Sequence, residues 1–380
     1  MKTKKHILFL SSWYPTRRKP FLGNFIQRQA KLLACDYKVT ALHLASNINL
    51  DRIEIEIHEE ENLKEIMVYH PKGKNMISKY TNMKKAFKKG VKLIEGVDLI
   101  QGNIIFSKGI QFVWAKKHFK CPLIVMEHSS FFHKKTIKDL NEQEKITLRN
   151  IVKNTDHLIT VSANLKNDLA PFFPYKPTTI IPNHIDTSIF KPETFPPNTI
   201  TEFLHISTLD EKSKNPLGII HAVDNLKADG YENFHLTIVS DEPTEKWAKV
   251  VAEKKLSKLI SFKGPLCWEA VPMFYQQADC FILFSNYETF SIVLAESWAC
   301  GIPTISTPVG IATNVESDIS TTIETNNINS LSEAMKNFIE NKIIFDRSKI
   351  IQHAQQFSER EVLSKYNNLL GSIFQTNSIK

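Results

Sequence analysis

The chain has 380 residues, of which 42% are hydrophobic and 23% charged, and its formal net charge is +8. This length and composition are typical of a folded two-domain protein, and no stretch reaches the ~18 apolar residues of a membrane-spanning helix. The five cysteines are scattered and form no CxxC pair. They argue against a disulfide framework or a zinc site and indicate reduced, buried thiols in a cytoplasmic protein.

Short apolar segments alternate with amphipathic segments of helical period from the start of the chain. The opening MKTKKHILFLSSW has too short an apolar core for a signal peptide, lacks a small-residue cleavage site, and is interpreted as a first strand. Residues 52–60, RIEIEIHEE, alternate strictly, as a half-exposed edge strand does. Elsewhere in the first half we expect strands at 6–13, 38–45, 97–102, 122–128, 157–162 and 178–183, with a helix at 24–35.

The second half of the chain continues the same alternation. We expect strands at 203–208, 234–240, 260–264, 280–285 and 303–308, and helices at 215–227, 329–340, 345–356 and 358–376. Strands this short and apolar are typical of parallel sheets that helices cover on both faces. The predicted fold class is therefore α/β, with two Rossmann-like doubly wound parallel-sheet domains. Because ligands of such sheets bind beyond the carboxyl ends of the strands, the two domains would face a cleft.

A proline-rich polar segment at 191–200, KPETFPPNTI, is the predicted linker between the domains. The charge changes sign there: residues 1–192 carry 32 basic and 17 acidic side chains, whereas residues 193–380 carry 16 and 23. We place the N-terminal domain at 1–192 and the C-terminal domain at 193–357, with a last helix at about 358–376 that is free to pack back on the first domain. The basic half suits an anionic partner, such as a membrane surface, a lipid phosphate or a nucleic acid, unless its lysines are simply solvated.

The segment 285–307, SNYETFSIVLAESWACGIPTIST, places two glutamates eight positions apart. A helix is predicted at about 290–300, with Glu288 before it and Glu296 inside it. Eight residues at helical rise separate the carboxylates by ~12 Å, beyond the ~5–9.5 Å of a glycosidase pair, so a ligand with hydroxyl groups at both ends and anions between would fit. The N–H groups at the helix start would bind such an anion. Alternatively, Glu288 favours the helix dipole and Glu296 lies on a solvated face.

The stretch ETFSIVLAESWACGIPTIST resembles the signature of the retaining family-4 glycosyltransferases of GT-B fold, which pair two glutamates at this spacing. The resemblance continues in the family's order from about residue 7 to 370. SSWYPTRRKPFLGNFIQRQA resembles the first strand and glycine loop, VMEHSS the histidine strand, IIPNHIDTSIFKP the hinge and FLHISTLDEKSKN the phosphate-binding loop. It implies an enzyme that moves a sugar from a nucleotide-diphospho-sugar to an acceptor selected by the first domain.

The resemblance also implies a role for each matching residue. The donor, a UDP- or GDP-sugar, would be held mostly by the second domain, without a further cofactor. A cation at Lys214 would stabilise the charge that develops on the departing diphosphate. The implied donor contacts are Glu296 with the ribose, Glu288 with the sugar, the backbone N–H groups of Phe290, Ser291 and Ile292, Lys214 and the position of Thr208 with the diphosphate, Gly23 with the phosphates, and His128 with the sugar near the reaction centre. Without the family, a lone strand-end histidine such as His128 is more often structural, and the alternative for Gly23 is an ordinary turn glycine.

The chain departs from the family pattern at positions that bear on this site. Ser207-Thr208 stands where the family usually has Gly-Arg, which removes one phosphate-binding cation and leaves Lys212 as the nearest substitute. Asn183-His184 replaces the usual Asn-Gly of the hinge. No Asp-x-Asp occurs, so we expect no metal and a leaving group stabilised by the lysine and the helix N-terminus. The family's retaining chemistry is usually explained by front-face attack.

The acceptor is expected to be a saccharide or a lipid-linked saccharide. The segment 83–96, MKKAFKKGVKLIEG, combines five lysines with Phe87, Val91 and Ile94. It is interpreted either as a basic amphipathic helix on an anionic membrane or as a solvated helix that packs an ordinary apolar stripe. The first interpretation places the protein in bacterial surface-polysaccharide biosynthesis, cytoplasmic and peripheral at the inner face of the plasma membrane.

Two other functional classes fit the same fold. The first is a sugar-nucleotide epimerase or phosphorylase, which would need no separate acceptor. The second is a non-catalytic protein that binds a membrane surface, which the loss of an arginine at Thr208 favours. A nucleic-acid partner is not expected, because no RNA-binding signature or aromatic-interleaved basic run occurs.

Overall fold

The computed structural model describes residues 4–194, 196 and 199–378, without the side chains of 377 and 378. The chain forms two compact units: the first consists of 1–183 together with 363–380, and the second of 184–362. This division falls nine residues before the expected boundary at 192/193. Residues 195 and 197–198 of the predicted linker lie outside the described residues.

The first unit is built on an eight-stranded sheet of order β3-β4-β2-β1-β5-β6-β7-β8. The strands are β1 (His6–Ser11), β2 (Lys38–Asn47), β3 (Glu54–Glu60), β4 (Leu63–Pro71), β5 (Leu99–Asn103), β6 (Leu123–Glu127), β7 (His157–Thr160) and β8 (Thr178–Ile180). All neighbours pair in parallel except β3 and β4. Strand β3 lies at the edge and is mostly exposed, so the prediction of an edge strand at 52–60 is confirmed.

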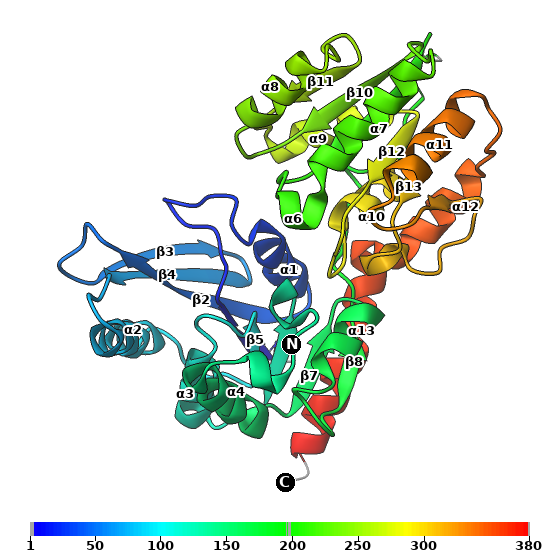
Figure 1. Cartoon of the computed structure of the whole chain (residues 1–380). Helices are drawn as coiled ribbons and strands as arrows, with labels where there is room; N and C mark the ends of the chain where they lie inside the picture. The colour runs from blue at the N-terminus through cyan, green and yellow to red at the C-terminus, as the bar shows by residue number, and fades with distance from the viewer. Residues whose placement is uncertain (1–3, 195, 197–198, 379–380) are drawn as a thin grey trace. The chain divides into compact units, whose positions relative to one another are not determined.

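Helices cover both faces of this sheet, as Figure 1 shows for α1 on one face and for α2, α3 and α4 on the other. They are α1 (Asn24–Ala34), α2 (Met76–Val91), α3 (Ile110–Phe119), α4 (Glu142–Asn154), α5 (Ala163–Leu169), the 3₁₀ turns Ser130–Phe132 and Ile137–Asp139, and the part of α13 (Glu359–Ser378) from Leu363 onward. Right-handed crossovers explain the two faces, because α1 connects β1 to β2 while α2 connects β4 to β5 in the opposite direction along the sheet. On the α1 face, the Met126 sulfur accepts hydrogen bonds from Gln29 of α1 at 3.2 Å and Tyr366 of α13 at 2.9 Å.

The second unit is built on a six-stranded, entirely parallel sheet of order β11-β10-β9-β12-β13-β14. Its strands are β9 (Thr201–Ile206), β10 (Phe234–Val239), β11 (Ile260–Lys263), β12 (Cys280–Leu283), β13 (Thr304–Ser306) and β14 (Ser320–Thr322). Its helices are α6 (Glu211–Lys214), α7 (Pro216–Ala228), α8 (Glu245–Glu253), α9 (Val271–Gln277), α10 (Ile292–Ala299), α11 (Ile328–Ile339) and α12 (Arg347–Ala354), with 3₁₀ turns at Trp268–Ala270, Gly310–Ala312 and Gln355–Phe357. The prediction of an α/β fold with two doubly wound sheets is therefore confirmed.

The sequence pattern missed two strands, β4 and β14. Strand β4 is buried on both faces, but its sequence LKEIMVYHP includes a lysine and a glutamate and neither alternates nor forms a purely apolar run. Strand β14 has only three residues, Ser-Thr-Thr, and none is apolar. Within the described residues, every helix is too short or too polar to cross a bilayer.

The structure corrects one interpretation of the basic segment 83–96. The helix there is α2, and the side chains of Phe87, Val91 and Ile94 are buried with exposed fractions of 4–6%. Helix α2 packs on β4 and β2, so this stripe belongs to the core of the first unit. For these three residues the second interpretation, an apolar stripe that packs against the protein, is therefore correct. Their side chains are not available to contact a membrane.

The second unit contains a fully buried histidine, His205 on β9, whose ring contacts the carbonyl oxygen of Ile282 at 2.9 Å and the Ser207 hydroxyl at 2.8 Å. Burial lowers the pKa of His205 to about 4. Because the pKa near 6.5 in the unfolded chain is higher, the unfolded state takes up the proton first as the pH falls. The free energy of unfolding should therefore lose about 3 kcal/mol from this residue between about pH 6.5 and pH 4.

We predict that His205→Gln flattens the pH dependence of unfolding. Near pH 5, the free energy of unfolding of the parent should change by about 1.2 kcal/mol per pH unit more than that of the variant. Urea unfolding at pH 7, 6, 5 and 4.5, followed by circular dichroism, measures both slopes. Equal slopes would show that this imidazole is protonated to the same extent in both states.

Candidate functional site

An ion pair lies at the carboxyl edge of the second sheet, where the adjacent strands β9 and β12 end. The loop after β9 carries Lys214 and the loop after β12 carries Glu288. The Lys214 Nζ lies 2.5 Å from the Glu288 Oε1, and the Ser285 hydroxyl donates to the same oxygen at 2.8 Å. The two ionic side chains retain exposed fractions of 21% and 10%. The charges are thus largely desolvated but still accessible to a ligand.

Further hydrogen bonds fix the two loops that carry this pair. Helix α6 is a single turn capped by Asp210, whose carboxylate accepts from the Ser213 N–H at 2.9 Å and the Ser213 hydroxyl at 2.7 Å. Asn286 then joins this turn to the β12 loop: its backbone N–H donates to the Ser213 carbonyl and its side-chain amide to the Lys212 carbonyl, both at 2.8 Å. The lysine and the glutamate are therefore held by backbone as well as by their own charges.

Gly310 supports the same loop from the segment after β13. Its φ of 56° is left-handed, and a Cβ at this position would lie 2.4 Å from the Phe290 carbonyl oxygen and 3.1 Å from the Glu288 Cβ. The next residue, Ile311, donates its N–H to the Phe290 carbonyl at 2.9 Å. Only glycine allows this close approach. A glycine that follows a predicted strand could have indicated such a close approach, but Gly310 was not predicted as part of the site.

Helix α10 begins two residues later than predicted, at Ile292 rather than Phe290. The reason is Ser291, which adopts φ 72° and ψ 74°, a left-handed conformation that costs a residue with a side chain about 1–3 kcal/mol. Its hydroxyl is buried and has no hydrogen-bond partner among the described residues. Of the three predicted backbone donors, Ile292 is thus in the first turn, whereas Phe290 and Ser291 precede it. The helix N-terminus and this hydroxyl together suit an oxyanion.

Glu296 lies inside α10 and is buried, with an exposed fraction of 6%. The hydroxyl of the fully buried Tyr275 on α9 donates to its Oε2 at 3.1 Å. Burial and the neighbouring carboxylate raise the pKa of Tyr275 well above its ordinary value, which keeps its hydroxyl a donor. The alternative in which Glu296 sits on a solvated face is therefore wrong. Tyr275 was not predicted as a site residue. Its segment, FYQQ, shows no pattern that marks a tyrosine as the partner of a residue in another helix.

His128 follows β6 in the first unit and is 5% exposed. Its ring lies 5.2 Å from the ring of Phe25, and neither ring nitrogen has a hydrogen-bond partner within the described residues. Burial lowers the pKa of His128 to about 3, although the nearby Asn183 side chain opposes the shift. The imidazole is therefore neutral at physiological pH, with a donor and an acceptor available for a ligand.

The neighbouring Glu127 is fully buried and positions the loop that carries His128. Its carboxylate accepts three backbone N–H groups: Ile105 at 2.9 Å, His128 at 2.9 Å and Ser129 at 2.8 Å. Burial raises the pKa of Glu127, and these hydrogen bonds oppose the rise. This role could not be predicted from the sequence, because the residue types around a strand-end glutamate do not show which backbone groups it will bond.

The remaining predicted residues lie in loops and at the ends of helices of the two units. Gly23 has φ 75° and precedes α1, and a Cβ there would lie 2.7 Å from the Trp13 carbonyl carbon, so packing within the first unit already requires glycine. Thr208 is exposed in the loop after β9, and Lys212 is exposed on α6. Asp186, in the segment that resembles the hinge, accepts hydrogen bonds from the Ser188 N–H at 2.9 Å and the Ser188 hydroxyl at 2.5 Å, which hold the turn at 186–188.

The structure thus brings Lys214, Glu288, Glu296 and the start of α10 together in the second unit, while Gly23 and His128 lie in the first. In the part of the chain that the structure describes, no group of three or more His, Cys, Asp or Glu side chains is placed to hold a metal ion. A paired lysine and glutamate, a helix N-terminus and a second buried glutamate can bind a ligand that carries both hydroxyl groups and an anion.

Family comparisons cover nearly the whole chain. Residues 24–189 match "Glycosyltransferase Family 4" and residues 186–357 match "Glycosyl transferases group 1". A curated relative, the MMP alpha-(1->4)-mannosyltransferase of Mycolicibacterium hassiacum, is 24% identical over 165 residues. That match covers 43% of this chain and spans only 39% of the relative's length.

Solved structures extend the similarity to the complete fold. The sucrose-phosphate synthase of Thermosynechococcus elongatus has a TM-score of 0.77 and 16% identity, and the match covers 98% of this chain and 100% of that one. The Anabaena protein HepE in complex with UDP has a TM-score of 0.73 and 14% identity, with 97% and 100% covered, and it has also been solved with UDP-glucose. At these identities the similarity shows the two-domain fold alone.

We predict that Gly310→Ala displaces the loop at Glu288–Phe290. The left-handed backbone alone should cost about 1–2 kcal/mol of unfolding free energy, and the added Cβ must push the Phe290 carbonyl away. Urea unfolding measures the loss, and a crystal structure of the variant shows the loop. Gly371→Ala in α13 is the matched control, because a Cβ there meets nothing within 4 Å and should stabilise the helix by up to about 1 kcal/mol. Equal stability of Gly310→Ala and the parent would contradict the packing argument.

We also predict that Glu127→Gln destabilises the first unit by about 2–4 kcal/mol. One side-chain oxygen would be replaced by an amide that points its hydrogens at a backbone N–H donor, which leaves buried donors unpaired. Thermal and urea unfolding measure the effect, with the exposed Glu95→Gln as the control. If the two variants unfold alike, Glu127 does not hold the loop.

Proposed function

Because the chain belongs to the family-4 glycosyltransferases of GT-B fold, we propose that it transfers a sugar from a nucleotide-diphospho-sugar to a saccharide or lipid-linked acceptor, with retention of anomeric configuration. The observation that carries the proposal is the ion pair of Lys214 and Glu288 beside the start of α10. At this position a carboxylate that can bind sugar hydroxyl groups is hydrogen-bonded to a cation that can bind phosphate.

In this proposal the donor lies across the carboxyl edge of the second sheet. The diphosphate contacts the Lys214 ammonium and the N-terminus of α10. The Ser291 hydroxyl, which has no hydrogen-bond partner in the described part of the chain, supplies one more donor there. Glu288 accepts hydrogen bonds from the transferred sugar. Glu296, held by Tyr275, accepts from the ribose hydroxyl groups. The structures of HepE with UDP and UDP-glucose support a nucleotide-sugar as the donor.

The proposed reaction needs no covalent intermediate on the protein. The bond between the sugar C1 and the diphosphate oxygen breaks, the acceptor oxygen bonds to C1 on the same face, and its proton passes to the departing phosphate. Lys214 and the dipole of α10 stabilise the charge on the leaving group without a metal. Neutral His128 donates to or accepts from the donor sugar near C1. Glu288 already bonds Lys214 and Ser285, which suits it to hold hydroxyl groups rather than to attack C1.

The first unit is proposed to select the acceptor. Its basic charge favours an anionic or membrane-bound acceptor, and surface-polysaccharide biosynthesis at the cytoplasmic face of the membrane is the context that we propose. An epimerase or phosphorylase of the same fold would turn the donor over without a second substrate. Product analysis with and without added acceptor therefore separates these reactions from glycosyl transfer, and a non-catalytic protein would give no product in either case.

We predict that Glu288→Gln lowers kcat about 10²–10³-fold, because the lysine loses its ion pair and the sugar loses a charged acceptor. Glu296→Gln should mainly raise the KM for the donor, since it binds the nucleoside end, and Tyr275→Phe should do so by a smaller factor. The assay is transfer from UDP-sugars with UDP affinity measured by calorimetry. Glu333→Gln, an exposed change on α11, is the control. If both glutamine variants transfer sugar at the parent's rate, the proposed site is wrong.

A further inference from the structure

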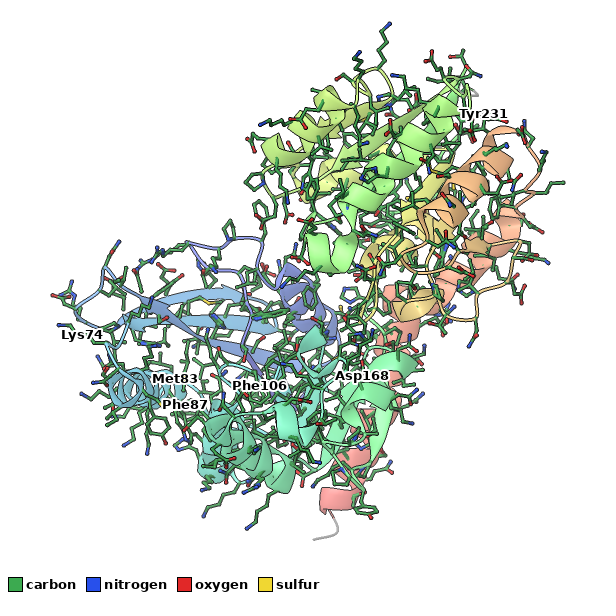
Figure 2. The ribbon with its side chains drawn as sticks, viewed as in Figure 1. Lys74, Met83, Phe87, Phe106, Asp168 and Tyr231 are labelled. Carbon is green, nitrogen blue, oxygen red and sulfur yellow. The ribbon has the colours of Figure 1, made fainter. Side chains whose placement is uncertain are left out.

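A groove of about 580 Å³ lies between α2 and α3 on one face of the first sheet. Phe87 on α2, labelled in Figure 2, forms part of its floor. None of its lining residues belongs to the donor site proposed above. The lining consists of Tyr80, Lys84, Phe87, Lys88, Val91 and Lys92 from α2 and its C-cap, and Trp114, Lys117 and His118 from α3.

Aromatic rings form the apolar part of the groove. The Trp114 indole lies edge-on to the Tyr80 ring at 5.3 Å and to the Phe87 ring at 5.5 Å. Phe87 is 5% exposed, whereas Tyr80 is 43% exposed. The cluster therefore begins in the core and ends at the surface, as aromatic side chains do where an apolar phase meets water.

Lysines form the rim of the groove. Lys84, Lys88 and Lys92 are spaced i, i+4 and i+8, so they project from one side of α2, and Lys117 adds a fourth cation from α3. Neither helix contains an aspartate or a glutamate. Among the described residues none of these four lysines forms an ion pair. Like charges at i, i+4 on a helix repel each other, and a bound anion would remove that repulsion.

We propose that this groove docks an anionic phospholipid of a bilayer leaflet. The lipid phosphate lies between the lysines of the rim, and the Trp114–Tyr80 rings lie at the level of the glycerol and upper acyl chain. Exposed Met76 and Ile77, at 65% and 78%, extend the apolar contact at the start of α2. This surface differs from the Phe87, Val91 and Ile94 stripe, which is buried. It stands independently of the proposed reaction.

Vesicle sedimentation of the full-length protein tests the charge requirement. Phosphatidylglycerol–phosphatidylcholine vesicles should bind the parent at 0.1 M salt, and phosphatidylcholine vesicles should not. Each lysine near an anionic surface contributes about fivefold to partitioning, so Lys84→Gln with Lys88→Gln and Lys92→Gln should weaken binding about a hundredfold. The charge-matched control is Lys246→Gln with Lys249→Gln and Lys258→Gln, three exposed lysines of the second unit, and it should bind within about twofold of the parent.

The fluorescence of Trp114 tests the groove itself. Trp114→Phe keeps an aromatic wall, so the emission of the parent minus that of the variant reports the Trp114 indole among the five tryptophans. This difference spectrum should shift to the blue on phosphatidylglycerol vesicles and be quenched by brominated acyl chains. Inorganic phosphate at 10 mM should not displace the vesicles. The proposal is overturned if the two lysine triples bind equally, if the difference spectrum does not respond to vesicles, or if phosphate alone displaces them.

Discussion

The ion pair between Lys214 and Glu288 is the constraint around which the second unit's site is arranged. Two charges removed from water are tolerable only when they face each other and their remaining bonding capacity is used, since one left alone costs several kcal/mol. The Ser285 hydroxyl bonds the Glu288 carboxylate, the two hydrogen bonds of Asn286 hold the backbone of the two loops together, and Gly310 makes room for the loop. Ser291, with its left-handed backbone, directly precedes the helix that begins beside this pair.

Much of the fold could be predicted, because the alternation of apolar strands and amphipathic helices is a local property of the chain. Strands β1, β2, β3 and β9 to β13 occur within a few residues of their expected positions. Strand β4 was missed because its burial on both faces depends on the helices α1 and α2, which its own sequence does not encode. The apolar stripe of α2 was ambiguous for a related reason: only the packed sheet decides whether Phe87 faces a core or a membrane.

The site was predictable in its members but not in its contacts. Glu288 and Lys214 are 74 positions apart and meet only because β9 and β12 are neighbours in the sheet order. Tyr275 and Glu127 act through hydrogen bonds to groups on other elements, and no spacing rule reveals such partners. The start of α10 shifted because one residue adopts a left-handed backbone, which a side-chain pattern does not report.

Helix α13 is shared between the two units. It starts at Glu359 in the second unit and continues from Leu363 as part of the first, where Tyr366 bonds Met126 and Asn367 bonds Tyr37. The polypeptide therefore passes between the units twice, at 183/184 and at 362/363. A single cut in either connection leaves the halves joined by the other. Conversely, residues 1–183 produced alone would lack a helix that covers their sheet, so a fragment that keeps the first unit whole must join residue 183 to the segment that begins at Leu363.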